Sequence, residues 1–173
     1  MCIRDSFSTR VRDDQRLDPA CADAVESAAT LLSELGHDVE AKDPDVDLDW
    51  LAGVWRRFSG VNVRLNVRRR EAVLGRPARE DELEAISRLS AEEGDRLAAP
   101  DYLEMLQAIH AFGRKMAEFH QDYDILLTPT LAREPVPLGE LVMTTEDIDD
   151  YYDRLFRYIS YTCLLYTSDA ADE

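Results

Sequence analysis

The two ends of the chain constrain its fold most, because both read as translated sequencing adapter. Met1–Ser6 is what ATG TGT ATA AGA GAC AG encodes when the next base completes a serine codon. Residues 163–168 are what TGT CTC TTA TAC ACA TCT encodes, and the two DNA strings are reverse complements over most of their length. They resemble the transposase end sequence used to fragment DNA for short-read sequencing. We therefore expect residues 1–6 and 163–173 to be adapter-derived, with few tertiary contacts, and the protein itself to be close to Phe7–Thr162, an internal piece of a longer gene.

The body between these ends is acidic and almost free of cysteine. The whole chain of 173 residues has a formal charge of −16, which disfavours binding to nucleic acid or to an anionic membrane. Cys2 and Cys163 lie in the end segments, so Cys21 stands alone and no disulfide framework is expected. No apolar run approaches the length of a membrane span. Arginine far outnumbers lysine, which with abundant alanine indicates a GC-rich bacterial genome, here metagenomic, and we expect a cytoplasmic parent protein.

The order of helix and strand signals predicts an α/β chain that is rich in helix. Phe7–Thr9 reads as the end of a strand. Asp18 and Pro19 are typical of a helix start, and Gly36 of a helix end. His37–Ala41 then alternates polar and apolar residues as a strand does. The strand–helix–strand order predicts a parallel pair of strands joined by a crossover helix.

The rest of the chain is mostly helical by its apolar spacing. Helices are expected over Asp47–Leu74, Glu80–Leu97, Pro100–His120 and Asp147–Ser160. Inside the first of these, Val61–Val67 alternates, so a strand is the competing interpretation there. The apolar side of the third is expected to contain Leu103, Leu106, Ile109, Phe112, Met116 and Phe119. Asp124–Thr128 predicts a short buried strand, which a Pro-rich loop over Pro129–Gly139 follows.

Two stretches of the chain combine these elements in a recognisable way. The first runs from Asp18-Pro19 through Val25–Ala29 and Leu31–Glu40, a helix that leads into a strand. The second runs from Phe112-Gly113-Arg114 through Asp122–Ala132 to Pro135–Glu140, with an apolar strand, a Thr-Pro-Thr turn and a Pro-rich loop that ends in Leu-Gly. In this order they resemble the amidase signature family of serine hydrolases, over nearly all of Phe7–Thr162.

The resemblance implies a helix-rich fragment of an α/β/α fold with an incomplete mixed sheet, from the second half of the parent. It implies hydrolysis of a carbon–nitrogen bond by a serine nucleophile, a cis-Ser and a Lys, through an acyl-enzyme. Lys42 and Lys115 do not sit in the family's lysine motif, and no Gly/Ser-rich tract occurs in the chain. The Lys and both Ser are therefore expected upstream of Phe7, and this fragment should be inactive. The parent is expected to act on a small-molecule amide, without metal or organic cofactor.

One local feature predicts a binding role. Thr128-Pro129-Thr130 closes the predicted strand at its carboxyl end, where open α/β sheets bind their ligands. We expect these residues to form a wall of the substrate pocket, and a turn that merely ends the strand is the alternative. Trp50 and Trp55 are expected to pack in the core rather than to line this pocket.

The remaining candidates favour structural roles. His37, His110 and His120 lack metal-ligand spacing, so no metal site is predicted. The basic patch of Arg64, Arg68, Arg69 and Arg70 is expected to be a solvated helix face paired with Glu71, with a phosphate site as the alternative. No matching base accompanies the serines at readable spacing, so no Ser-His-Asp triad is predicted for Ser8, Ser59, Ser87 or Ser160. The alternative to an amidase fragment is an acidic, helix-rich protein-interaction module without enzymatic activity.

Overall fold

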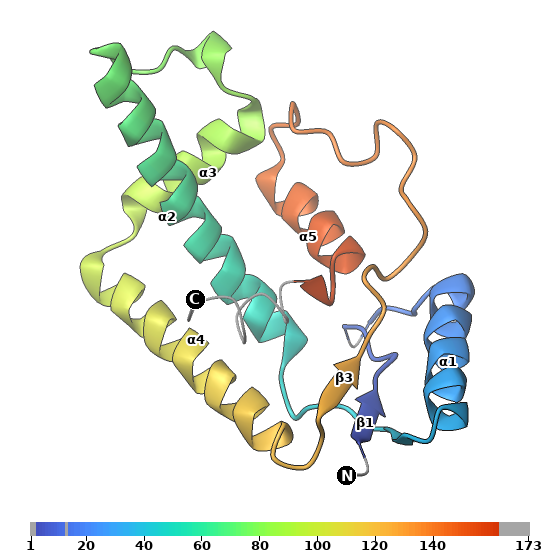
Figure 1. Ribbon diagram of the computed structural model, residues 1–173. Coiled ribbons are helices and arrows are strands. Elements are labelled where there is room, and N and C mark those ends of the chain that lie inside the picture. The colour runs from blue at the N-terminus through green and yellow to red at the C-terminus, as the bar shows by residue number, and fades with distance from the viewer. Residues whose placement is uncertain (1–2, 13, 163–173) are drawn as a thin grey trace. The chain divides into compact units, whose positions relative to one another are not determined.

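The computed structural model describes residues 3–12 and 14–162. Its strands are β1 (Arg4–Phe7), β2 (Asp38–Ala41) and β3 (Ile125–Leu127), as Figure 1 shows. Its helices are α1 (Pro19–Glu34), α2 (Leu48–Leu74), α3 (Ala85–Arg96), α4 (Ala99–Phe119) and α5 (Ile148–Tyr158), with a short 3₁₀ turn, η1 (Glu80–Glu82). The fold divides into two compact units. The sheet unit contains the described parts of residues 1–49, 109–136 and 157–173, and the helical unit contains residues 50–108 and 137–156.

The sheet unit is built on a parallel sheet with the strand order β2-β1-β3. Helix α1 connects β1 to β2. Its start is fixed by Asp18, whose carboxylate accepts a hydrogen bond from the backbone N–H of Ala20 at 2.9 Å, and by Pro19 in the first turn. After its end, Gly36 has a φ of +96°, a conformation that favours glycine. The predicted strand–helix–strand unit is confirmed.

The central strand lies where no packed structure was expected. Arg4, Asp5 and Ser6 form most of β1, and Asp5 and Ser6 are 0% exposed. The prediction that residues 1–6 make few tertiary contacts is therefore wrong for these three. The physical reason is that a strand pairs through backbone N–H and C=O groups, which every residue type but proline supplies. The adapter origin of both ends stays a prediction, and residues 163–173 lie outside the described part of the chain.

In the helical unit, α2 continues as a helix through Val61–Val67, so the competing strand interpretation is wrong. The helix predicted over Glu80–Leu97 is instead divided into η1 and α3, with an extended backbone at Leu83 and Glu84. The break follows from the side chain of Glu82, which accepts hydrogen bonds from the Arg79 N–H at 2.9 Å and from the Arg76 guanidinium at 2.7 Å and 2.8 Å. These bonds fix a tight turn just before α3 begins.

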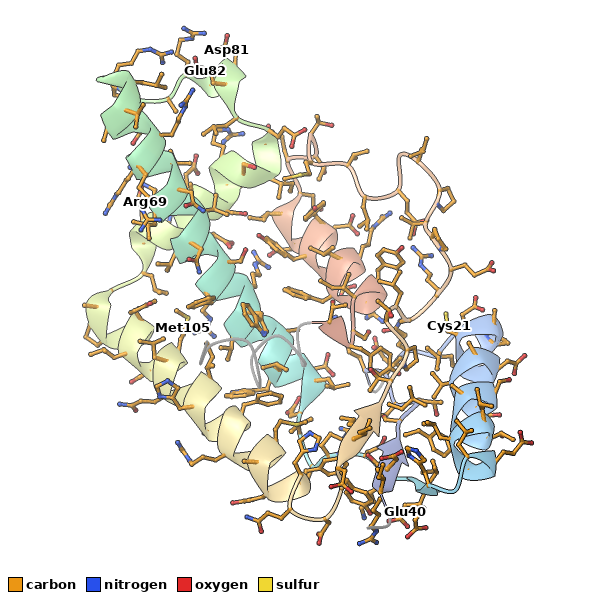
Figure 2. The ribbon with its side chains drawn as sticks, viewed as in Figure 1. Cys21, Glu40, Arg69, Asp81, Glu82 and Met105 are labelled. Atoms are coloured by element: carbon orange, nitrogen blue, oxygen red, sulfur yellow. The ribbon has the colours of Figure 1, made fainter. Side chains whose placement is uncertain are left out.

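Three predictions about burial are wrong. Leu103 is 57% exposed, and Met105, which Figure 2 labels, is buried in its place, whereas Phe112 and Met116 are buried as expected. A helix turns about 100° per residue, so three successive steps of three residues bring Leu103 to the side opposite Phe112. Trp50 is 45% exposed rather than in the core. Ile125 is also 45% exposed, because β3 is an edge strand of the described sheet.

None of the helices in residues 3–12 and 14–162 is both long enough and apolar enough to cross a membrane.

Candidate functional site

The carboxyl ends of the three strands bring distant polar residues together. Ser8 follows β1, Asp43 lies just beyond β2, and Thr128 follows β3. The Ser8 hydroxyl donates a hydrogen bond to the Asp43 carboxylate at 2.5 Å and accepts one from the backbone N–H of Arg10 at 3.2 Å. Parallel strands all end at one edge of their sheet, which is why residues 35 positions apart meet here.

A small pocket, which we call the edge pocket, lies at this edge of the sheet. It has a volume of about 20 Å³, and Ser8, Asp43, Val46, Leu126, Thr128 and Tyr161 are among the residues that line it. Tyr161 is 3% exposed, and its hydroxyl has no hydrogen-bond partner among the described residues. Burial, and then the negative charge of Asp43, raise the pKa of Tyr161 above its ordinary range. Its hydroxyl therefore stays protonated and remains a hydrogen-bond donor at neutral pH.

A larger hollow, which we call the turn groove, is also lined by Thr128. It has a volume of about 480 Å³ and is bounded by Thr128, Pro129 and Thr130 with the residues after them, and by one side of α1. The α1 side consists of Ala20, Cys21, Ala24, Val25 and Ala28. Pro129 is buried and Thr130 is exposed. All three residues predicted to form a pocket wall thus line a real hollow, and Thr128 borders both the turn groove and the edge pocket.

Cys21 is the one nucleophile type on the α1 side of the turn groove, where Figure 2 labels it. Burial, followed by the nearby carboxylates of Asp18 and Glu134, raises the pKa of its thiol. The thiol rather than the reactive thiolate is therefore favoured, and Cys21 contributes a small, weakly polar surface to the groove.

Two of the three histidines take part in structural contacts. His37 Nδ1 lies 2.5 Å from a carboxylate oxygen of Asp5, and His120 Nδ1 lies 3.0 Å from the carbonyl oxygen of Tyr123. Within the described residues, no group of three or more His, Cys, Asp or Glu side chains could hold a metal ion.

Two arginines of the basic patch on α2 are paired, although their main partner is not the predicted Glu71. Arg64 lies 3.5 Å from Glu71 but 2.7 Å from Asp95, and Arg68 lies 2.8 Å from Asp95. These guanidinium groups lower the pKa of Asp95. Asp95 belongs to α3, so the patch stabilises a contact between two helices of the helical unit.

Sequence reasoning missed the Ser8–Asp43 pair and Tyr161. The pair has one signal in the sequence: Ser8 and Thr128 lie at the carboxyl ends of the predicted Phe7–Thr9 and Asp124–Thr128 strands, and Asp43 comes shortly after the predicted His37–Ala41 strand. The signal for Tyr161 is weaker, since it follows the last helix and is brought to the sheet edge only by the fold.

Comparison with known proteins assigns the chain to a family. The sequence matches the profile of the family described as Amidase over residues 9–172. The 6-aminohexanoate-cyclic-dimer hydrolase of Paenarthrobacter ureafaciens is 28% identical over 133 residues, which are 75% of this chain and 27% of that protein. The present chain thus spans about a quarter of the length of this relative.

Solved structures share the fold. A structure of 6-aminohexanoate cyclic dimer hydrolase superposes with a TM-score of 0.82 at 24% sequence identity, over 96% of this chain and 36% of that one. A bacterial aryl acylamidase of the amidase signature family superposes with a TM-score of 0.69 at 16% identity, over 95% of this chain and 35% of that one. The expected helix-rich part of an amidase-signature fold is therefore confirmed. With a profile match over nearly its whole length, the chain belongs to the amidase family.

Proposed function

We propose that the parent protein hydrolyses the carbon–nitrogen bond of a small-molecule amide, and that this chain is part of its second half. The observation that carries the proposal is the family match over residues 9–172. The activities after which its relatives are named, those of a cyclic-dimer hydrolase and an aryl acylamidase, support the same reaction class. The alternative, an acidic protein-interaction module, has no support in these comparisons.

In the proposed reaction, a serine hydroxyl attacks the amide carbonyl carbon and forms an acyl-enzyme. The amine leaves with a proton, and water then cleaves the ester and releases the acid. We place the serine nucleophile, the cis-Ser and the Lys upstream of Phe7, so the chain supplies no catalytic residue. That the parent needs no cofactor, acts in the cytoplasm and has no nucleic-acid or membrane partner stays a prediction of the sequence.

The contribution of this chain to the reaction is a wall of the substrate pocket, formed by Thr128, Pro129 and Thr130. The turn groove supports this role, because its volume of about 480 Å³ falls in the size range of small-molecule sites, roughly 300–1,000 Å³. The Thr128 hydroxyl can donate to an amide carbonyl and accept from an amide N–H. Buried Pro129 fixes the turn in place, and the alanines of α1 offer an apolar face to the rest of the substrate.

The test uses the parent gene recovered from the source DNA. We expect the full-length protein to hydrolyse linear or cyclic small amides and the 173-residue chain to hydrolyse none above background. In the parent, Thr128→Val should raise KM more than it lowers kcat, and Thr30→Val, on the exposed face of α1, should change neither. A turnover by the 173-residue chain that is lost on mutating one of its own residues would overturn the placement of catalysis upstream.

A further inference from the structure

Arg70, the last arginine of the basic patch on α2, is set apart from the two arginines that pair with Asp95. It is exposed, and its side chain makes no ion pair or hydrogen bond with the residues that the structure describes. It lies three residues from Val67 and four from Leu74, so the three side chains share one face of α2. All three line a hollow in the helical unit.

This hollow, which we call the helix hollow, lies between α2 and the segment that runs from Ala78 into the start of α3 (Figure 1 shows both helices). It has a volume of about 500 Å³, within the roughly 300–1,000 Å³ of small-molecule sites. Its apolar lining includes buried Val67 and half-buried Val63 and Leu83. The helix hollow can therefore hold an apolar chain, and it lies in a different unit from the turn groove.

The polar groups of the helix hollow favour a negative charge in the ligand. Besides Arg70, the lining has Asn66 and Ser87, whose side chains also have no hydrogen-bond partner in the part of the chain that the structure describes. The carboxylate in the lining, that of Glu82, is already paired with two arginines, at 2.7 Å and 3.2 Å. Its charge is thus balanced within the protein, and the N–H donors of Arg70 are left for a ligand.

We propose that the helix hollow binds a carboxylate that carries an apolar chain. A carboxylate matches the planar fork of the Arg70 guanidinium, which can donate two parallel hydrogen bonds to its oxygens. The Asn66 amide and the Ser87 hydroxyl can donate to the remaining lone pairs. A phosphate dianion would meet one unpaired arginine in this lining, in a chain with a formal charge of −16, so a single negative charge fits better. The apolar chain of the ligand lies against the apolar lining, which removes both surfaces from water.

Binding of radiolabelled octanoate to the 173-residue chain, measured by equilibrium dialysis, tests the site. We expect Arg70→Gln to weaken binding about tenfold, because a hydrogen-bonded charge pair is lost. Val63→Phe narrows the helix hollow from the side of α2 and should also weaken binding. Arg69→Gln is the matched control: Arg69, which Figure 2 labels, is the neighbouring arginine and does not line the hollow, so binding should stay unchanged. Circular dichroism checks that each variant keeps its helices.

Competing ligands separate the role of the charge from that of the apolar chain. Octanol and acetate each keep one half of octanoate, and both should displace it far less well than unlabelled octanoate does. If octanol competes equally, the hollow is an apolar surface without an anion site. If acetate or inorganic phosphate competes equally, Arg70 only attracts anions. Either result overturns the proposal.

The dialysis itself can also contradict the site. An absence of octanoate binding, no loss in Arg70→Gln, or an equal loss in Arg70→Gln and Arg69→Gln would each overturn it. If Val63→Phe loses its helices, Arg70→Gln and the competing ligands still decide. None of these measurements involves amide hydrolysis, so failure here is distinct from failure of the proposed function.

Discussion

Asp5 is the side chain that suits its position least. It lies at 0% exposure in the central strand, with one carboxylate oxygen 2.5 Å from His37 Nδ1 and the other without a partner among the described residues. Buried parallel strands normally carry apolar side chains on both faces. A carboxylate here is what an unselected segment would leave in a strand position, which agrees with the adapter origin that we predict for residues 1–6.

Substitution of Asp5 tests this interpretation. Replacing a buried ion pair by apolar residues is often neutral or stabilising by about 1–4 kcal/mol, whereas removing one partner typically costs about 3–5 kcal/mol. We therefore expect the double variant Asp5→Val/His37→Leu to keep or raise the free energy of unfolding in urea. His37→Ala leaves the Asp5 carboxylate buried without this partner and should lower it, at the small end of that range because the His37 side chain is 20% exposed. A loss in the double variant as large as that of His37→Ala would mean that the pair stabilises the sheet.

Glu82 provides a pH-dependent prediction. Hydrogen bonds from Arg76, and next from the Arg79 N–H, lower its pKa from 4.5 to about 2. Because the folded pKa is the lower one, the contact stabilises the fold above the ordinary carboxyl pKa and is lost as the pH falls toward 2. We expect an NMR titration of the Glu82 carboxyl to have its midpoint near 2, and the midpoint to rise in Arg76→Gln while staying below 4.5, because the Arg79 N–H still donates to the carboxylate. An unchanged midpoint in Arg76→Gln would show that Arg76 does not lower the pKa of Glu82. High salt should raise the midpoint of the native protein, because the ion pair of Arg76 with Glu82 lies at the surface and is screened.

At the scale of elements, one glycine contact fixes how α2 and α3 pack in the helical unit. A Cβ added to Gly94 would lie 2.4 Å from the carbonyl oxygen of Gly60, so the two helices would have to separate. We expect Gly94→Ala to lower the free energy of unfolding by about 1–3 kcal/mol, as overpacking does. Gly53→Ala, also in α2 but with nothing within 4 Å, should raise it by up to about 1 kcal/mol through helix propensity. Equal effects of the two substitutions on thermal unfolding would contradict the close contact.

The elements that sequence reasoning placed correctly depend on local rules. Asp18, Pro19 and Gly36 bound α1 because a cap, a first-turn proline and a left-handed glycine act within a few residues. The errors depend on distant partners. Glu82 divides the predicted Glu80–Leu97 helix through Arg76, and the ion pair of Arg64 with Asp95 joins two helices. The candidate site also divides into local and distant features. The Thr128–Thr130 turn was predictable because it depends on the end of one strand. The contact between Ser8 and Asp43 depends on two neighbouring strands, so it follows only from the sheet.

At the scale of the whole molecule, the central position of β1 makes residues 1–6 important to the fold, which their adapter origin did not predict. The sheet order β2-β1-β3 places both outer strands on β1, so a deletion of residues 1–6 removes most of their shared partner. We expect this deletion to abolish hydrogen-exchange protection at β2 and β3, although the adapter origin of residues 1–6 predicts that they make few tertiary contacts. Asp5→Val should keep that protection, because the backbone ladder remains. Unchanged protection after the deletion would show that β1 is dispensable.

The open outer edge of β3 is expected to make the chain self-associate in solution. No further strand pairs with β3 among the described residues, its sequence Ile125–Leu127 is wholly apolar, and Ile125 is 45% exposed. An open apolar edge is a template for pairing with another chain. We expect the 173-residue chain to self-associate at micromolar concentration in light scattering and sedimentation, and Ile125→Lys to reduce the association. Leu31→Lys, at a residue 55% exposed on α1, should reduce it much less, since a helix surface offers no unpaired backbone groups. Equal effects of the two lysines would trace the association to exposed apolar side chains in general, and a monomeric wild-type chain would contradict the open edge itself.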